Sequence, residues 1–159
     1  MKRIVRLCVN EEEVELAIEP STLLLDVLRE QMGLTGARRG CESSYCGACT
    51  VLLDERTAHS CTLLAALVAG RKITTVEGLA RGAALDPLQQ AFIERNGFQC
   101  GYCTPGMILA ARALLLQNPD PSEAEVRRAL DGNLCRCTGY QKIVESIMEG
   151  AKHYRREKK

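Results

Sequence analysis

Residues 40–49 read Gly40-Cys41-Glu42-Ser43-Ser44-Tyr45-Cys46-Gly47-Ala48-Cys49, which places three thiols within nine residues. A fourth thiol, Cys61, follows after eleven more residues. Thiols at this spacing can point at one small inorganic core only if the backbone curls around that core and offers its N–H groups to the sulfurs. Gly40 and Gly47 ease such a path. The stretch therefore predicts a metal centre that fastens a loop to the rest of the chain.

The kind of metal centre is indicated by the gaps between the cysteines. C-x4-C-x2-C with a distant fourth cysteine is the spacing of plant-type ferredoxins, in which four thiolates hold a 2Fe-2S cluster. Disulfides are disfavoured, because the chain starts with an alternating strand pattern and not with a long apolar signal region. Structural zinc sites favour paired C-x2-C knuckles, which gaps of four, two and eleven do not match. Clusters of cysteines without a chemical use are rare.

Composition limits the class of protein. The 159 residues are 46% hydrophobic and 26% charged, as in an ordinary globular chain of one medium or two small domains. A net charge of +1 argues against a nucleic-acid partner, and the apolar runs are far shorter than a membrane span. Because the chain has no Trp and only two Phe, each core must be small and aliphatic. We expect a cytoplasmic protein, or one peripheral to the inner face of the inner membrane.

The N-terminal half has strand patterns around the cysteine loop. The expected elements are a hairpin over 4–9 and 13–18, a helix that Ser21 or Thr22 can cap and Gly33 ends, a second hairpin over 50–53 and 57–60, and a strand over 72–76. Strand, strand, helix and cysteine loop is the order of a β-grasp ferredoxin. Cys8 lies in the first strand, and we expect it to be a buried hydrophobe because the other eight cysteines form two sets of four.

From Glu77 onward the apolar pattern becomes helical. The expected helices cover 85–96, 105–117, 122–130 and 140–151, with Asp86 capping the first and a capping box at Ser122 opening the third. Four helices with short connections predict a bundle. We therefore expect an α+β fold with a β-grasp domain over 1–76 and a helical domain over 77–159.

The helical half holds a second set of four thiols, Cys100, Cys103, Cys135 and Cys137, in the pattern C-x2-C-x31-C-x-C. Both pairs precede expected helices, where free backbone N–H groups and the positive end of the helix dipole favour an anionic centre. Two ligand pairs on two connectors predict one shared centre. Taken alone, this set also suits zinc, and the ferredoxin-type loop upstream weakens that alternative.

Five motifs carry a resemblance to a known family. They are Gly40-Cys41, Cys46-Gly47-Ala48-Cys49-Thr50-Val51, Thr75-Val76-Glu77-Gly78-Leu79, Gln99-Cys100-Gly101-Tyr102-Cys103-Thr104-Pro105-Gly106-Met107 and Gly132-Asn133-Leu134-Cys135-Arg136-Cys137-Thr138-Gly139-Tyr140. The chain resembles, over nearly its whole length, the small iron-sulfur subunit of the xanthine oxidase family of molybdenum hydroxylases, to which carbon monoxide dehydrogenase and aldehyde oxidoreductase belong. Many members have Gly at the position of Ser44. The stretch Glu42-Ser43-Ser44-Tyr45 is more similar to the carbon monoxide dehydrogenase branch and its relatives.

The resemblance implies two 2Fe-2S clusters, one on Cys41, Cys46, Cys49 and Cys61 and one on Cys100, Cys103, Cys135 and Cys137. It also implies that Gln99 and Cys137 lie against the pterin of a molybdenum cofactor in a large subunit, and that the first cluster faces FAD in a medium subunit. A dimer of such heterotrimers is expected. The alternative is a stand-alone two-cluster electron carrier or redox sensor.

The chemistry that the chain itself offers is electron relay. The sequence has no phosphate-binding Gly loop, no motif that pairs a nucleophile with a base, and only two His, of which His59 is expected to be structural. Arg38 and Arg39, just before the first ligand, and Arg136, between two ligands, can stabilise a reduced and more negative cluster. Substrate choice belongs to the molybdenum pocket, so aldehydes, carbon monoxide, N-heterocycles, purines and aromatic thioesters all fit this sequence.

Overall fold

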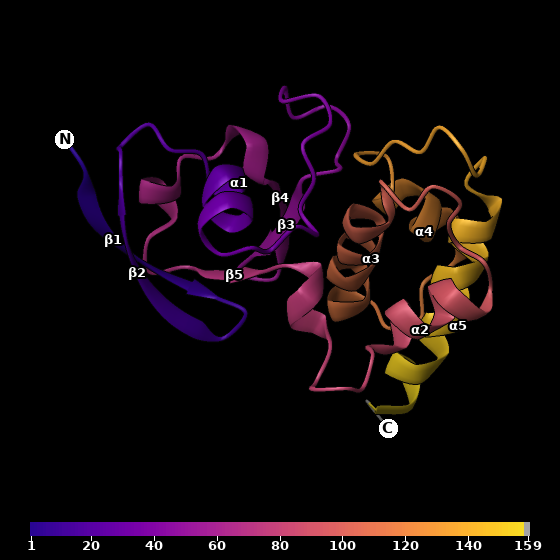
Figure 1. Ribbon diagram of the computed structural model, residues 1–159. Helices are drawn as coiled ribbons and strands as arrows, with labels where there is room; N and C mark the ends of the chain where they lie inside the picture. The colour runs from indigo at the N-terminus through magenta and orange to yellow at the C-terminus, as the bar shows by residue number, and fades with distance from the viewer. Residues whose placement is uncertain (158–159) are drawn as a thin grey trace.

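The computed structural model describes residues 1–157. Its N-terminal half contains a sheet whose strands have an alternating apolar pattern (Figure 1). The strands are β1 (Arg3–Val9), β2 (Glu12–Ile18), β3 (Thr50–Leu53), β4 (Arg56–His59) and β5 (Lys72–Thr74). They lie in the order β2-β1-β5-β3-β4, with β1 parallel to β5 and the other neighbours antiparallel. Val5, Leu7 and Val9 of β1 are buried, whereas the residues between them are not. Side chains that point to alternate faces of a strand produce this pattern.

Cys8 lies on the outward face of β1. It is half-buried, with Glu13 of β2 and Lys72 of β5 as its neighbours across the sheet. The expectation that Cys8 belongs to the core is wrong, because the period of two that buries Leu7 and Val9 turns Cys8 to the other face.

Both hairpins close with two-residue turns of left-handed backbone. The φ angles are 51° and 69° at Asn10 and Glu11, and 47° and 66° at Asp54 and Glu55. Two successive residues with positive φ match the twist of the flanking strands, and Asn and Asp tolerate this conformation better than most residues. The turn between β3 and β4 therefore forms from Asp54 and Glu55, although such turns usually contain a glycine. Arg56, which the sequence suggested as part of that turn, begins β4.

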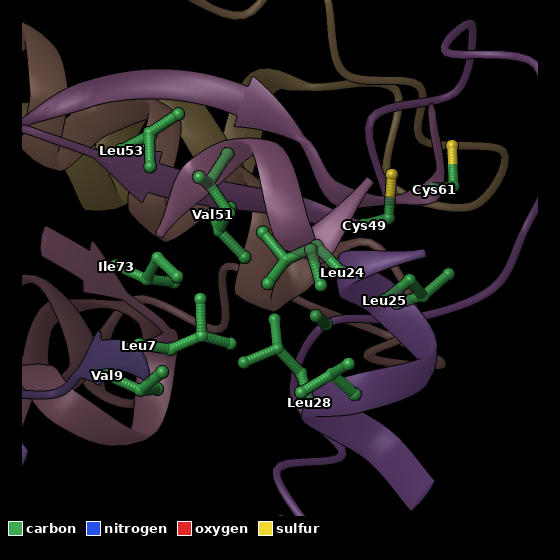
Figure 2. Packing of buried hydrophobic residues seen from close by; sticks show 14 of the residues in the cluster. Leu7, Val9, Leu24, Leu25, Leu28, Cys49, Val51, Leu53, Cys61 and Ile73 are labelled. Carbon is green, nitrogen blue, oxygen red and sulfur yellow. The ribbon is translucent and has the colours of Figure 1, made fainter. Parts of the chain in front are cut away.

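One short helix covers the sheet. Helix α1 (Leu24–Asp26) continues as a π-helical segment, Val27–Gln31, and buries Leu24, Leu25 and Leu28 against the sheet (Figure 2). Shorter 3-10 segments cover Ser60–Thr62, Ala65–Val68 and Val76–Leu79. Val76 and Leu79 pack against the core of the helical half. The domain boundary expected near residue 76 coincides with this last segment and stays a prediction.

The helices of the second half are α2 (Pro87–Glu94), α3 (Thr104–Gln117), α4 (Glu123–Ala129) and α5 (Gln141–Glu157). Asp86 and Ser122 cap α2 and α4 in capping boxes, as their sequences predict. Helix α5 runs beyond the expected residue 151, because buried Tyr154 donates a 2.5 Å hydrogen bond to the Asp86 carboxylate. The last two residues of the expected helical domain, 158–159, lie outside the described residues. None of the helices in residues 1–157 combines the length and apolarity that a membrane crossing requires.

Helix α3 joins the two halves. It stands between the sheet and the other helices (Figure 1), and its buried Leu109 and Ala113 pack against Leu52 of β3. An amphipathic helix would bury one face, whereas α3 is apolar on nearly every side because it is covered from both directions. The expected α+β class, with a β-grasp half followed by a helical half, is confirmed.

The cysteine loops of the two halves meet in a close contact. The side-chain amide of buried Asn133 donates to the Gly47 carbonyl (2.9 Å) and the Thr50 hydroxyl (3.2 Å). Beside it, the Leu134 N–H donates to the Cys46 carbonyl at 2.9 Å. These bonds join residues that are more than eighty positions apart in the sequence.

Asn133→Leu should lower the free energy of unfolding by about 1–3 kcal/mol, because it removes two buried hydrogen bonds and leaves the Thr50 hydroxyl with one partner fewer. Urea unfolding of the cluster-loaded chain, followed by circular dichroism, measures the change. Gln117→Leu, at an exposed position at the end of α3, is the matched control and should have almost no effect. Equal unfolding midpoints for the two variants would show that Asn133 does not hold the loops together.

Candidate metal centres

The first cysteine loop surrounds Cys41 with backbone donors. The N–H groups of Ser43, Tyr45 and Cys46 point at Cys41 Sγ over 3.5, 3.3 and 3.3 Å. Hydrogen bonds from Ser43, and then from the N–H groups of Cys46 and Tyr45, lower the pKa of the Cys41 thiol to about 6. Donors that stabilise the charged form favour a thiolate, which is the form of cysteine that binds metals.

The loop keeps its shape through close contacts and left-handed turns. A Cβ on Gly40 would stand 2.7 Å from Cys46 Sγ, so a side chain at this position would displace that thiol. Ser44 has a φ of 58°, a conformation in which glycine is unstrained. Its hydroxyl bonds to Thr62, and its carbonyl accepts a 2.9 Å hydrogen bond from His59 Nδ1. His59 is therefore structural, as expected.

Cys49 and Cys61 form the buried side of the first set. They are 2% and 3% exposed, and Figure 2 shows their sulfurs at the edge of the core, directed away from its apolar side chains. Ser60 brings them together, since its N–H and its hydroxyl both donate to the Cys49 carbonyl. Burial, followed by the neighbouring thiols Cys61 and Cys46, raises the pKa of Cys49 to about 12. Positive charge is needed to hold Cys49 as a thiolate, and a metal centre supplies it.

The second set is paired crosswise between its two connectors. Cys100 and Cys137 are exposed, with their sulfurs 3.5 Å apart. Cys103 and Cys135 are half-buried and interact through their thiols. Burial, followed by the contact with Cys135, raises the pKa of Cys103 to about 12. Each pair thus takes one cysteine from the connector before α3 and one from the connector before α5.

The two connectors place their thiols at different distances from the helices that follow them. Cys103 is the N-cap of α3, as predicted for a pair at a helix start. Cys135 and Cys137 precede α5, as predicted, but lie about a turn away from its first residue. The N–H and hydroxyl of Thr138 in this turn bond to Cys135 Sγ at 3.4 and 3.0 Å. Burial acts to raise the pKa of Cys135, but hydrogen bonds from Thr138, from the Cys137 backbone and from Cys103 together outweigh burial, so the pKa is lowered.

Tyr140 has a role that the sequence did not indicate. It was expected in the apolar stripe of the last helix, but it lies before α5 with a φ of 69°. Its hydroxyl accepts a 2.9 Å hydrogen bond from the Cys135 N–H and donates to the Asn133 carbonyl. The position of Gly139-Tyr140 directly after Cys-x-Cys-Thr was the available signal, because a glycine there favours a turn over a helix.

One sulfur pair of the second set has the spacing of two thiolates that share a metal. Within residues 1–157, no three Cys, His, Asp or Glu side chains are placed to ligate a single ion. Two thiolates on one tetrahedral metal with bonds of about 2.3 Å lie slightly under 4 Å apart. Cys100 and Cys137, at 3.5 Å, match that spacing. A 2Fe-2S cluster takes one such pair on each iron.

The remaining predicted residues surround these thiols. Gln99 is exposed beside Cys100. Arg136 is exposed, whereas the guanidinium of Arg39 pairs with Asp26 and Glu42. Arg38 points its guanidinium at the second set and not at the first.

Two family descriptions divide the chain between them. "2Fe-2S iron-sulfur cluster binding domain" matches residues 8–80, and "[2Fe-2S] binding domain" matches residues 75–148. The xanthine dehydrogenase iron-sulfur-binding subunit of Escherichia coli O157:H7 is 45% identical over 89% of this chain and 89% of its own length. The aldehyde oxidoreductase of Megalodesulfovibrio gigas is 44% identical over 90% of this chain, but over only 16% of its own length.

Among solved structures, a chain of quinoline 2-oxidoreductase from Pseudomonas putida 86 superimposes with a TM-score of 0.94 at 43% identity, covering 98% of this chain and 97% of that one. Agreement in sequence and in fold therefore extends across both halves and both cysteine loops. The chain belongs to the xanthine oxidase family of molybdenum hydroxylases, as an electron-transfer subunit with two 2Fe-2S binding domains.

Proposed function

We propose that the chain relays electrons from a molybdopterin-type molybdenum cofactor in a large subunit, through two 2Fe-2S clusters of its own, to FAD in a medium subunit. The ligands are Cys41, Cys46, Cys49 and Cys61 for the first cluster and Cys100, Cys103, Cys135 and Cys137 for the second. Each cluster accepts one electron at a time. The observation that carries the proposal is that the two cysteine loops contact each other across the junction of the two halves.

The pairing of the thiols supports this assignment. Cys100 and Cys137 would hold the outer iron of the second cluster, and Cys103 and Cys135 the inner one. In the first loop, exposed Cys41 receives three backbone N–H groups, while Cys49 and Cys61 are buried together. Hydrogen bonds to sulfur and differences in exposure are the means by which a protein sets a cluster's potential.

A short connection between the two sets supports transfer from one to the other. The carbonyl of Cys46, a ligand of the first set, accepts the N–H of Leu134 at 2.9 Å. Leu134 is covalently bonded to Cys135, a ligand of the second set. One hydrogen bond thus links two otherwise covalent paths, and electron tunnelling decays more slowly through bonded atoms than through gaps.

The surface around the second set supports a large partner at that end. Phe98, Tyr102 and Leu134 are 42%, 47% and 47% exposed beside the exposed Cys100 and Cys137. Apolar side chains gathered around a site are typical of a surface that another protein covers. In the Megalodesulfovibrio gigas relative, the matching stretch is a small part of a much longer chain.

The proposed order of the relay rests on the pterin contact that the family resemblance implies for this end of the chain. Cys137 and Gln99 meet the pterin, so the second cluster receives the electron first and the first cluster passes it to FAD. A hydroxylation releases two electrons. The two clusters pass them on one at a time, because each cluster accepts one electron. We assign the heterotrimer, and its dimer, to the cytoplasm, a reducing compartment in which cysteines stay out of disulfides and can bind metal. The more specific resemblance of Ser44 to the carbon monoxide dehydrogenase branch stays a prediction.

The purified chain should be brown and contain about four irons and about four acid-labile sulfides, because two 2Fe-2S clusters fill the two sets of thiols. Metal analysis and visible absorption give the answer. Colourless protein that contains zinc in place of iron would contradict the assignment.

Gln99→Ala should keep both clusters, because the amide is not a ligand, yet weaken assembly with the large subunit. A lost hydrogen bond to the cofactor corresponds to about 0.5–1.5 kcal/mol, or roughly a two- to tenfold loss of affinity. Titration of the purified large subunit with the cluster-loaded chain measures this affinity.

Gln90→Ala is the matched control, since Gln90 is exposed on α2 and bonds to Glu94 of its own helix. Its affinity for the large subunit should equal that of the parent chain. If Gln99→Ala binds as tightly as Gln90→Ala, Gln99 does not contact the cofactor.

A further inference from the structure

Arg38 belongs to the first half of the chain, but its charge lies at the second cysteine set. Its side chain donates a 2.6 Å hydrogen bond to the carbonyl of Gly101, the residue that follows Cys100. The guanidinium carbon also lies 5.3 Å from the centre of the Tyr102 ring. Gly101 and Tyr102 are the two residues between Cys100 and Cys103, so a positive charge stands directly beside the connector that carries both thiols.

This position is fixed from both sides. The Arg38 backbone N–H donates to the Ala48 carbonyl at 2.9 Å, which anchors the residue to the first cysteine loop. In the reverse direction, the Tyr102 hydroxyl donates to the Arg39 carbonyl at 2.7 Å. Arg38 is half-buried, and an arginine held by a hydrogen bond, an aromatic face and its own backbone has little freedom to move away.

Arg38 differs in this respect from its neighbour. Arg39 pairs with both Asp26 and Glu42, so its charge is compensated locally. Among the described side chains, no carboxylate pairs with Arg38. Of the two guanidinium charges, that of Arg38 is therefore the one that no described carboxylate pairs with.

We propose that Arg38 raises the reduction potential of the second cluster, so that the ferredoxin-like half tunes the cluster held by the helical half. Reduction adds one negative charge to a cluster, and a fixed positive charge nearby stabilises that state in a partly desolvated setting. The inference rests on the proposed assignment of Cys100, Cys103, Cys135 and Cys137 as ligands. It makes the potential of the electron-receiving cluster depend on the docking of the two halves.

The test is a redox titration of the full, cluster-loaded chain followed by electron paramagnetic resonance. Cys49→Ser, which removes a proposed ligand of the first cluster, assigns the two signals. Arg38→Gln should lower the equilibrium constant for reduction of the second cluster about tenfold, equivalent to about 59 mV for a one-electron couple. The constant of the first cluster should stay within about twofold.

Three further variants separate charge from structure. Arg38→Met, uncharged and of similar length, should shift the second cluster as Arg38→Gln does, so either variant serves if the other fails to load. Arg38→Lys keeps the charge and should retain most of the potential. Arg39→Gln should shift the second cluster less than Arg38→Gln does, because the Arg39 guanidinium lies against Asp26 and Glu42 and not against the connector that carries Cys100 and Cys103.

Unchanged reduction of the second cluster in both neutral variants would overturn the inference. So would a larger shift in the first cluster, or an Arg38→Lys shift equal to that of Arg38→Gln. These results leave two 2Fe-2S signals in the parent chain and therefore leave the proposed function standing. Absence of the second signal from the parent chain would instead refute the ligand assignment on which both depend.

Discussion

The two cysteine loops approach so closely that no Cβ fits between them. A Cβ on Gly47 would lie 2.3 Å from the Gly132 carbonyl, and one on Gly106 would lie 2.4 Å from the Gly47 carbonyl. Contacts this short exclude every side chain, and Gly47 also has a φ of 69°. Gly47 and Gly106, from two separate segments, thus allow backbone to pack on backbone, and the side-chain amide of Asn133 donates a hydrogen bond to the Gly47 carbonyl at the same contact.

This contact determines what the thiols can do together. It places the Cys46 carbonyl against the Leu134 N–H, and it brings Arg38 of one half beside Gly101 of the other. Two metal-binding halves on a flexible linker would hold their centres at variable separations. Here the separation is fixed by buried hydrogen bonds and by α3, which packs on both the sheet and the helices. A fixed separation is what a relay needs, because tunnelling rates fall steeply with distance.

The sequence predicted the parts of this structure that depend on local pattern. Alternation predicted the hairpins, and the capping boxes predicted at Asp86 and Ser122 are present. The two ligand sets inferred from cysteine spacing stay a prediction. The sequence failed where contacts join distant residues. The crosswise pairing of Cys100 with Cys137 and the contact of Asn133 with Gly47 depend on tertiary packing, which no local pattern encodes.

Other errors have local causes of their own. Cys8 faces outward because strand alternation outweighs the general tendency of cysteine to be buried. Tyr140 was assigned to a helix on hydrophobicity, yet its hydroxyl serves the Cys135 N–H in a turn. In both cases a general preference of the residue type was weighed above the geometry of its immediate neighbours.

The order of the relay is the central claim, and rapid mixing of the whole complex containing Cys46→Ser with its oxidisable substrate tests it most directly. The variant removes a proposed ligand of the first cluster and leaves all four proposed ligands of the second. We expect the molybdenum centre and the second cluster to be reduced as in the parent complex, while reduction of the flavin stalls. A flavin that is reduced at the parent rate in this complex would contradict the account.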